Sequence, residues 1–258
     1  MDAVALLRLQ IEWGADEALD DAPWDRLRPA PPPVPTRPAP SQKPTPQTIP
    51  AAVAPAEARR LAEVAPTLDA LRAAMANFEG CQLRTTASSL VFGDGACAAG
   101  VALVGEAPDA ESDRSGNAFA GPGGRMLDVM LASIRLTRGD VRLLTLTPWR
   151  PPGGRAPSDA EIAACLPFTL RHLALLRPRA LVLMGNLACR WVGGIEGGVR
   201  RARGRWQGVN VPGLPEPVPS LALPLPEQVL SQAASKEAAW AELLRLRRVL
   251  DAPAITQR

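Results

Sequence analysis

The apolar run Val101-Ala-Leu-Val104 stops abruptly in Gly105-Glu-Ala-Pro108, and no other feature of the chain constrains its fold as much. Short apolar runs bounded by turn residues are typical of strands that are buried on both faces of a sheet. Open α/β sheets bind their ligands outside the carboxyl ends of the strands. The run therefore predicts a buried strand that opens, at residues 105–108, into a ligand-binding edge.

Strand-like and helical patterns alternate along the chain. Strands are expected at residues 101–104, 141–145 and 180–184, with shorter candidates at 208–211 and 219–223. Helices are expected at residues 61–78, 125–134, 159–176, 187–192 and 227–250, the last with Trp240 and Leu244 on its inner side. Ser158 and Glu161 have the spacing of a capping box at the start of the third helix. This alternation predicts an α/β fold, a three-layer α/β/α sandwich around a central, mostly parallel sheet.

Composition divides the chain into four parts. Residues 1–28 carry apolar side chains at Val4, Leu7 and Ile11 and predict a short amphipathic helix. Residues 29–55 are rich in proline, which is typical of an extended, semi-rigid linker, with an SH3-type ligand as the alternative. Residues 56–251 are long enough for one three-layer domain, and residues 252–258 are expected to form a tail.

The net charge of +3 is too small to indicate nucleic-acid binding by itself. The positive charges are concentrated, however, because residues 200–205 contain four arginines, and Arg150 and Arg155 flank a Pro-Gly turn. Arginines grouped in this way either contact phosphates or lie solvated on the surface. Both interpretations stay open at this point.

Targeting and cysteine patterns favour the cytoplasm. The start of the sequence lacks the basic region and long apolar stretch of a secretory signal, and no run approaches the ~18 apolar residues of a membrane-spanning helix. The four cysteines, at positions 81, 97, 165 and 189, are scattered and form no CxxC pair, which favours reduced thiols. We therefore expect a cytoplasmic, bacterial protein that is a monomer and contacts no membrane.

From about Leu68 to Leu250 the chain resembles the type 4 uracil-DNA glycosylases. The N-terminal half of the resemblance rests on F-E-G-C-Q-L-R from Phe78, L-V-F-G-D-G from Leu90, G-E-A-P from Gly105, D-R-S-G from Asp113 and F-A-G from Phe119. The C-terminal half rests on R-P-P-G-G-R from Arg150, E-I-A-A-C-L-P from Glu161, P-R-A-L-V-L-M-G from Pro178 and R-G-R-W from Arg203. Each segment alone is a weak signal, but their common order and spacing make a specific one.

The resemblance implies that a uracil flipped out of DNA binds at the sheet edge, where water cleaves the bond between base and sugar. Glu106 matches the family's acid beside the sugar, and Phe119 matches the aromatic residue that stacks on the base. Gly105 and Ala107 match the base-binding loop. An ordinary core aromatic and a solvated loop carboxylate are the alternatives for Phe119 and Glu106.

The resemblance also implies contacts with DNA and a set of cluster ligands. Arg150, Arg155 and Arg203 are the candidates for contacts with DNA. The family's iron–sulfur cluster needs four cysteine thiolates. Cys81 and Cys165 match two of these positions, whereas Phe78 and Trp149 occupy the other two. We therefore expect that no 4Fe-4S cluster is bound, that the two aromatic rings fill its space and that both thiols behave as small apolar groups.

Three active-site positions depart from the family's pattern. Asp109 replaces a glycine, and its side chain is expected to crowd and repel a phosphate. Thr145 replaces the asparagine that reads uracil, and losing such a polar reader typically costs about 10⁴-fold in discrimination. Leu225 replaces the histidine that donates to the leaving uracil, a loss of about 10²–10³ in rate. The only histidine, His172, lies within an expected helix, where a structural or surface role is expected.

Three functions therefore remain open. The first is a divergent uracil-DNA glycosylase of base-excision repair with weakened or lost uracil excision. The second is a non-catalytic relative that binds DNA, uracil-containing or single-stranded, and the third is an interaction protein whose N-terminal segment recruits a protein partner. A polar group in the space left by Thr145 and Leu225 would favour the first. Arginines of residues 200–205 that point away from Phe119 would weaken the second.

Overall fold

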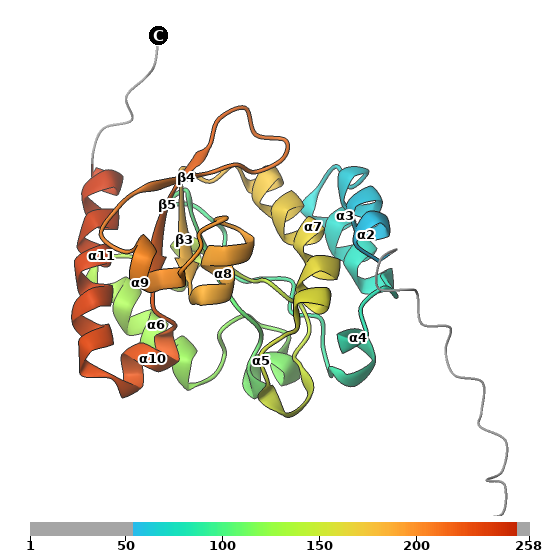
Figure 1. Ribbon diagram of the computed structural model, residues 1–258, viewed down its shortest axis with the longest axis horizontal. Helices are drawn as coiled ribbons and strands as arrows, with labels where there is room; N and C mark the ends of the chain where they lie inside the picture. The colour runs from blue at the N-terminus through green and yellow to red at the C-terminus, as the bar shows by residue number, and fades with distance from the viewer. Residues whose placement is uncertain (1–53, 252–258) are drawn as a thin grey trace, which may run out of the picture. The chain divides into compact units, whose positions relative to one another are not determined.

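The computed structural model describes residues 54–251, and a five-stranded sheet lies at its centre (Figure 1). The strand order is β2-β1-β3-β5-β4, with β1 at Val101–Gly105, β2 at Val141–Thr145, β3 at Ala180–Met184, β5 at Val218–Leu223 and β4 at Gln207–Val209. Four strands are parallel, and only the edge strand β4 runs antiparallel to its neighbour. The expected three-layer α/β fold is confirmed.

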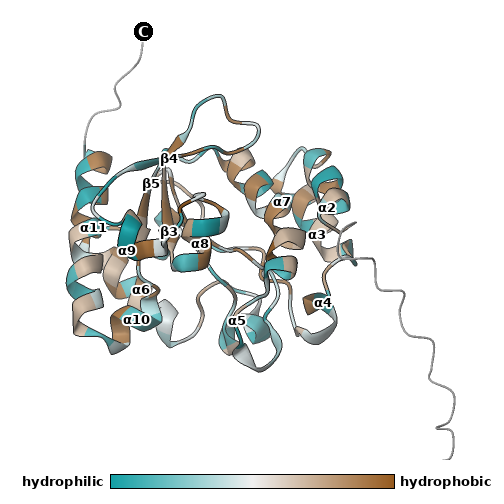
Figure 2. Ribbon diagram, in the orientation of Figure 1, coloured by the Kyte–Doolittle hydropathy of each residue, from teal (hydrophilic) through white to brown (hydrophobic). Residues whose placement is uncertain are grey.

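Helices cover both faces of the sheet (Figure 1). One face packs against α6 (Pro122–Ser133), α10 (Pro226–Ser231) and α11 (Ala233–Asp251). The other face packs against α7 (Asp159–Leu176), α8 (Asn186–Trp191) and α9 (Gly198–Ala202). Because both faces are covered, β1 and β3 are buried along their whole length, and the strands are mainly hydrophobic in Figure 2.

A third apolar cluster lies beside the sheet, where α2 (Ala54–Glu63) and α3 (Leu68–Asn77) pack against α7. The short helix α4 (Leu83–Thr86) and the loop before β1 complete this cluster. It contains Phe78 and Phe168, whose rings meet edge to face with centroids 5.1 Å apart. It also contains the two cysteines that match the family's cluster positions.

The order of the strands determines where a ligand can bind. Consecutive strands β1 and β2 are neighbours, whereas β3 lies on the opposite side of β1. The register pairs Gly105 at the end of β1 with Thr145 at the end of β2. The loops that follow β1 and β3 leave the sheet at this switch point, which is where doubly wound sheets bind ligands.

Two of the expected helices are each divided in the structure. The pattern over residues 61–78 forms α2 and α3, because Pro66 cannot continue a helix and Thr67 caps α3 by accepting from the Ala70 N–H at 3.2 Å. The pattern over residues 227–250 forms α10 and α11, which are separated at Gln232. The expectation that Trp240 and Leu244 face inward is wrong, since they are 47% and 37% exposed.

The other expected elements lie close to their expected positions. Helix α7 has the expected bounds, and its capping box is formed, with Ser158 N–H donating to Glu161 Oε2 at 2.7 Å. None of the described helices is long and apolar enough to cross a membrane. The helix expected within residues 1–28, the linker up to residue 53 and the tail 252–258 lie outside the described residues, so the domain boundaries stay predictions.

Candidate functional site

A cavity of about 390 Å³ opens at the carboxyl ends of β1 and β2. Five of the predicted site residues line it: Glu106, Ala107, Phe119, Arg150 and Arg155. The other lining residues are Pro108, Asp109, Ala110, Ser112, Thr145, Gly154, Ala156, Pro157, Leu225 and Glu227. The fold therefore brings together, at one sheet edge, segments that are separated by more than a hundred positions in the sequence.

Glu106 follows β1 and is held by the start of α8. Its Oε1 accepts a hydrogen bond from the Leu187 N–H at 2.9 Å. Gly185, at φ +92°, lies directly beside this oxygen, and any side chain there would collide with it. Burial raises the pKa of the Glu106 carboxyl, the N–H groups of Leu187 and Asn186 act against this shift, and the negative charge of Glu227 adds to it. The result is one half-buried carboxylate in a fixed orientation at the cavity wall.

Phe119 stands opposite the end of β1. Its ring packs over Gly105, where an added Cβ would lie 2.5 Å from the ring's Cζ atom. Gly105 therefore leaves room for an aromatic ring across the strand end. Phe119 itself has φ +55°, a left-handed conformation that non-glycine residues rarely adopt. Its side chain lines the cavity, as predicted, and is 8% exposed.

Asp109 has a structural role in the loop between β1 and α5 (Ala110–Ser115). One carboxylate oxygen accepts from the Ser112 N–H at 2.7 Å and caps α5, and the other accepts from the Gly121 N–H at 3.1 Å. Both oxygens are thus bonded within the protein, although the residue lines the cavity. Asp109 therefore orders the loop, and the expectation that its side chain repels a phosphate stays a prediction.

The match to a known family runs through all of these segments. The family model described as the Uracil DNA glycosylase superfamily matches residues 92–244, more than half of the 258 residues. The chain belongs to this superfamily.

Several curated proteins with the name Type-4 uracil-DNA glycosylase are similar to this superfamily member. The protein from Pyrobaculum aerophilum is 33% identical over 123 residues, which cover 48% of this chain and 63% of that protein. The protein from Archaeoglobus fulgidus is 37% identical over 112 residues, covering 43% and 56%. The protein from Thermotoga maritima is 31% identical over 125 residues, covering 48% and 65%. The matches thus span between 56% and 65% of the length of these relatives.

The two positions where the superfamily member lacks the expected polar readers both face the cavity. Thr145 Oγ1 donates its only proton to the Thr147 carbonyl at 2.8 Å, so it has none left for a ligand. Leu225 lines the cavity with an apolar side chain. Glu227, two residues further on, was not singled out by the sequence analysis, yet it also lines the cavity. Its side chain lies over Gly123 in the first turn of α6. Proline at position 226 is typical of the first turn of a helix, and this pattern could have predicted that Glu227 lies at a helix start facing the site.

The three predicted DNA-binding arginines do not lie together. Arg150 and Arg155 line the cavity, whereas Arg203 follows α9 and is absent from the lining residues in the described part of the chain. Arg155 forms a bidentate ion pair with Glu161, with N–O distances of 2.6 and 2.8 Å. This pair raises the pKa of Arg155 and lowers that of Glu161 to about 2. None of the arginines at residues 200–205 lines the cavity, which weakens their predicted role beside Phe119.

The residues at the family's cluster positions do not fit a four-thiolate cluster. Cys81 and Cys165 are buried with their Sγ atoms 3.6 Å apart, and Phe78 and Trp149 are buried in the same apolar cluster. The hydrogen bond with Cys81, together with burial, raises the pKa of Cys165 well above its ordinary value. The remaining two cysteines, Cys97 and Cys189, belong to other parts of the fold. Residues 54–251 contain no group of three or more metal-binding side chains. The expectation that no cluster is bound stays a prediction.

His172 lies in the core and outside the cavity lining. Its Nε2 accepts from Arg142 Nε at 3.1 Å, and its ring centroid lies 4.5 Å from that of Phe92. Burial, together with the positive charge of Arg142, lowers the pKa of His172 to about 3. The imidazole is therefore neutral near neutral pH and holds Arg142, so the structural interpretation is the one that fits.

Proposed function

We propose that this member of the uracil-DNA glycosylase superfamily binds a DNA strand at the cavity and takes a flipped pyrimidine, uracil first of all, against Phe119. Excision of the base is weakened or lost. The observation that carries the proposal is the composition of the cavity wall. The aromatic ring and the carboxylate of Glu106 are in place, whereas Thr145 and Leu225 offer no hydrogen-bond donor to the base.

The chemistry of base excision explains why this combination supports binding more than cleavage. As the bond breaks, positive charge develops on the sugar and negative charge on the departing pyrimidine. Glu106 is suited to stabilise the sugar or to orient the attacking water. The negative charge on the base requires donors aimed at its oxygen in a dry pocket, and removal of one such donor costs about 10²–10³ in rate. Glu227, which also lines the cavity, brings no N–H donor.

Arg150 supports the binding part of the proposal. It lines the cavity from the loop after β2, next to the turn that ends at Arg155. An arginine at the rim of a base pocket is well placed to contact the phosphate of a flipped nucleotide. Such contacts position the strand and carry no sequence information, so they fit binding of single-stranded or uracil-containing DNA alike.

A single-turnover assay on a single-stranded, uracil-containing oligonucleotide tests the proposal. We expect slow or undetectable uracil release by the wild type, with Glu106→Gln as the control that removes any residual cleavage. We expect Leu225→His to raise the rate by roughly 10²-fold, because it places a donor at the cavity wall. Binding of the same strand is measured in parallel by fluorescence anisotropy.

The outcomes separate the candidate functions. Fast release that disappears in Glu106→Gln would contradict weakened excision and indicate a working glycosylase. No release together with measurable binding would support a non-catalytic DNA-binding relative, the alternative that the same cavity wall favours. No binding of any strand would refute the proposal and favour an interaction protein, whose partner is expected at residues 1–28.

A further inference from the structure

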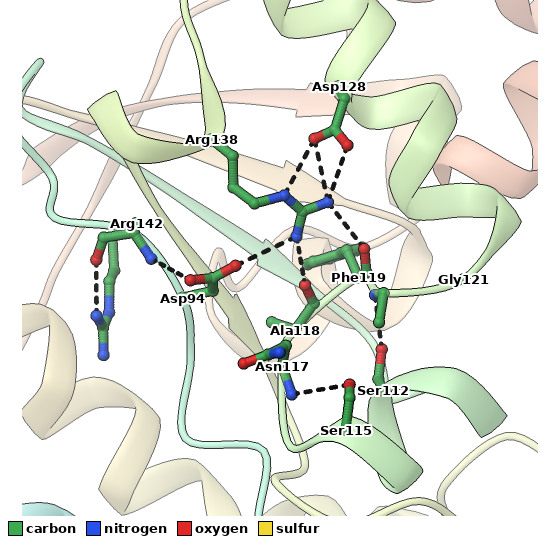
Figure 3. Close-up of polar contacts among 12 residues, drawn as sticks. Asp94, Ser112, Ser115, Asn117, Ala118, Phe119, Gly121, Asp128, Arg138 and Arg142 are labelled. Carbon is green, nitrogen blue, oxygen red and sulfur yellow. Dashed lines mark hydrogen bonds and ion pairs between the residues drawn. The ribbon is translucent and has the colours of Figure 1, made fainter.

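Several peptide groups of the loop that carries Phe119 are held by hydrogen bonds to side chains. The Asn117 N–H donates to Ser115 Oγ at 3.3 Å, and the Ala120 N–H donates to Ser112 Oγ at 3.0 Å (Figure 3). The Gly121 N–H donates to Asp109. The carbonyls of residues 118 and 119 both accept from a single side chain.

That side chain is Arg138, which lies just before β2 in the short 3-10 helix η1 (Arg138–Asp140). Its Nη1 donates to the Ala118 carbonyl at 2.7 Å, and its Nη2 donates to the Phe119 carbonyl at 2.9 Å (Figure 3). Both contacts meet the loop where Phe119 has its left-handed φ of +55°. Residues in such conformations persist only where the surrounding structure fixes them.

Two carboxylates hold the guanidinium from the other side. Asp128, on α6, accepts from Arg138 Nε at 3.1 Å and from Nη2 at 3.3 Å, and Asp94 accepts from Nη1 at 3.4 Å. Asp94 is itself bridged to Leu143 in β2 through paired backbone hydrogen bonds of 3.0 and 2.8 Å. An arginine has five N–H groups, and here all five are engaged. The guanidinium therefore joins α6 and the β2 side of the sheet to the Phe119 loop.

Steric contacts restrict the position of the Phe119 ring further once its backbone carbonyl is held. Gly124, in the first turn of α6, lies so close to the Phe119 carbonyl that an added Cβ would overlap it. On the cavity side the ring rests on Gly105. Arg138 itself is absent from the described residues that line the cavity, and its side chain is 27% exposed. We therefore expect its effect on a bound base to pass through Phe119.

We propose that Arg138 is a positioning residue that sets the Phe119 ring over the cavity, so that a flipped base finds a preformed stacking surface. The stacking role of Phe119 rests on the proposed function, whereas the positioning of the ring does not. Because lysine keeps the positive charge but cannot supply a planar fork of donors, Arg138→Lys separates geometry from charge.

The first arm of the experiment observes the ring without DNA. The chain has four phenylalanines, so fluorophenylalanine labelling gives four ¹⁹F resonances, and Phe119→Leu assigns one of them. We expect Arg138→Lys to shift or broaden the Phe119 resonance and to leave the other three unchanged. Arg171→Lys is the matched control. Arg171 also donates two hydrogen bonds to a backbone carbonyl, that of Ala65, with N–O distances of 3.0 and 2.7 Å, and it does not line the cavity. If Arg138→Lys does not fold, Asp128→Asn is measured in its place, because Asp128 holds the Arg138 guanidinium against the loop.

The second arm measures affinity for a single-stranded, uracil-containing oligonucleotide. Loss of a base–aromatic stacking contact costs roughly 5- to 150-fold in affinity, which is the range expected for Phe119→Ala. We expect Arg138→Lys to cost a smaller share, about three- to tenfold, and to have no further effect in the Phe119→Ala background.

Each outcome has one meaning for the proposal. An unchanged Phe119 resonance in Arg138→Lys would overturn it. An affinity loss that persists in the Phe119→Ala background would also overturn it, because Arg138 would then act on the strand directly. A changed resonance in a protein that binds no strand would refute the proposed function and leave the positioning role supported.

Discussion

At the scale of single residues, the polar atoms around the cavity are bonded within the protein more completely than their residue types suggest. The Thr145 hydroxyl donates to a backbone carbonyl, and both oxygens of Asp109 accept from backbone N–H groups. In the core, outside the cavity lining, His172 accepts from Arg142, which also donates to the Gly95 carbonyl at 2.7 Å. These side chains hold the protein's own elements together, and what remains for a ligand is the ring of Phe119, the carboxyl groups of Glu106 and Glu227 and the guanidinium of Arg150.

His172 offers a clean test of the core at this scale. Its pKa of about 3 lies far below the ordinary value of a histidine, so the unfolded chain takes up a proton at a pH where the folded protein does not. The free energy of unfolding should therefore fall as the pH drops from about 6 towards 4, by up to roughly 1.4 kcal/mol per pH unit from this group. Because the chain has one histidine, its ¹H–¹³C resonance needs no assignment in a protein without a histidine tag. We expect no titration between pH 8 and 4, and a midpoint near 6.5 would contradict the described packing.

At the scale of elements, the helices α2, α3 and α7 build an apolar cluster beside the sheet. Phe78 and Trp149 stand at two positions where the family has thiolates, and both rings are buried, at 1% and 3% exposure. A cluster held by four thiolates would cross-link these elements covalently, and the prediction that none is bound implies that aromatic packing holds them instead. The stability of this region therefore depends on side-chain volume.

Phe78→Ala measures that dependence. We expect the free energy of unfolding to fall by about 3–5 kcal/mol, as for other large-to-small changes at fully buried aromatic positions. Val64→Ala is the control, since Val64 lies at the end of α2 and is 69% exposed, so its loss should stay within about 0.5 kcal/mol. Both values come from urea unfolding. Equal losses for the two variants would mean that Phe78 does not pack as described.

The sequence pattern predicts the elements well where burial alone determines them. Apolar runs locate β1 and β3 to within a residue, because a strand covered on both faces is mainly apolar, and they also locate β2, although β2 contains Arg142 and Thr145. The apolar periodicity over residues 61–78 continues through Pro66, although the helix does not, since proline removes an N–H group without changing the hydrophobic pattern.

The site was less accessible to sequence reasoning than the sheet. Glu106 and Phe119 could be predicted because they belong to recognisable segments next to a strand end. The contacts of Arg138 and Glu227 could not, because they depend on how η1 and α10 pack against the start of α6. Such contacts are set by tertiary structure, and no spacing along the chain encodes them.

At the scale of the whole molecule, the arginines that the sequence suggests for contacts with DNA fall into two groups. Arg150 and Arg155 lie at the cavity, whereas the arginines of residues 200–205 lie around α9 and the start of β4. Arg155 already pairs with Glu161, and Arg150 forms no ion pair within residues 54–251. The two cavity arginines are therefore unequal candidates for contacting a phosphate.

The salt dependence of DNA binding distinguishes them. Each phosphate contact to a single strand contributes about 0.7 to the slope of log K against log salt concentration. We expect Arg150→Ala to reduce the magnitude of this slope by about 0.7. Arg155→Ala should reduce it less, because Glu161 competes with the phosphate for Arg155. Arg60→Ala, on the exposed side of α2, is the control and should leave the slope unchanged. A larger effect of Arg155→Ala than of Arg150→Ala would contradict this ranking.

The two hydrogen bonds of Asp109 bear on how far a change at this one position would spread. An exchange of Asp109 for glycine would free the Ser112 and Gly121 N–H groups that the carboxylate now holds. Ser112 lies in α5, and Gly121 is the N-cap residue of α6. One carboxylate thus joins the starts of two helices, so that its loss would loosen the loop after β1 and the loop that presents Phe119 together.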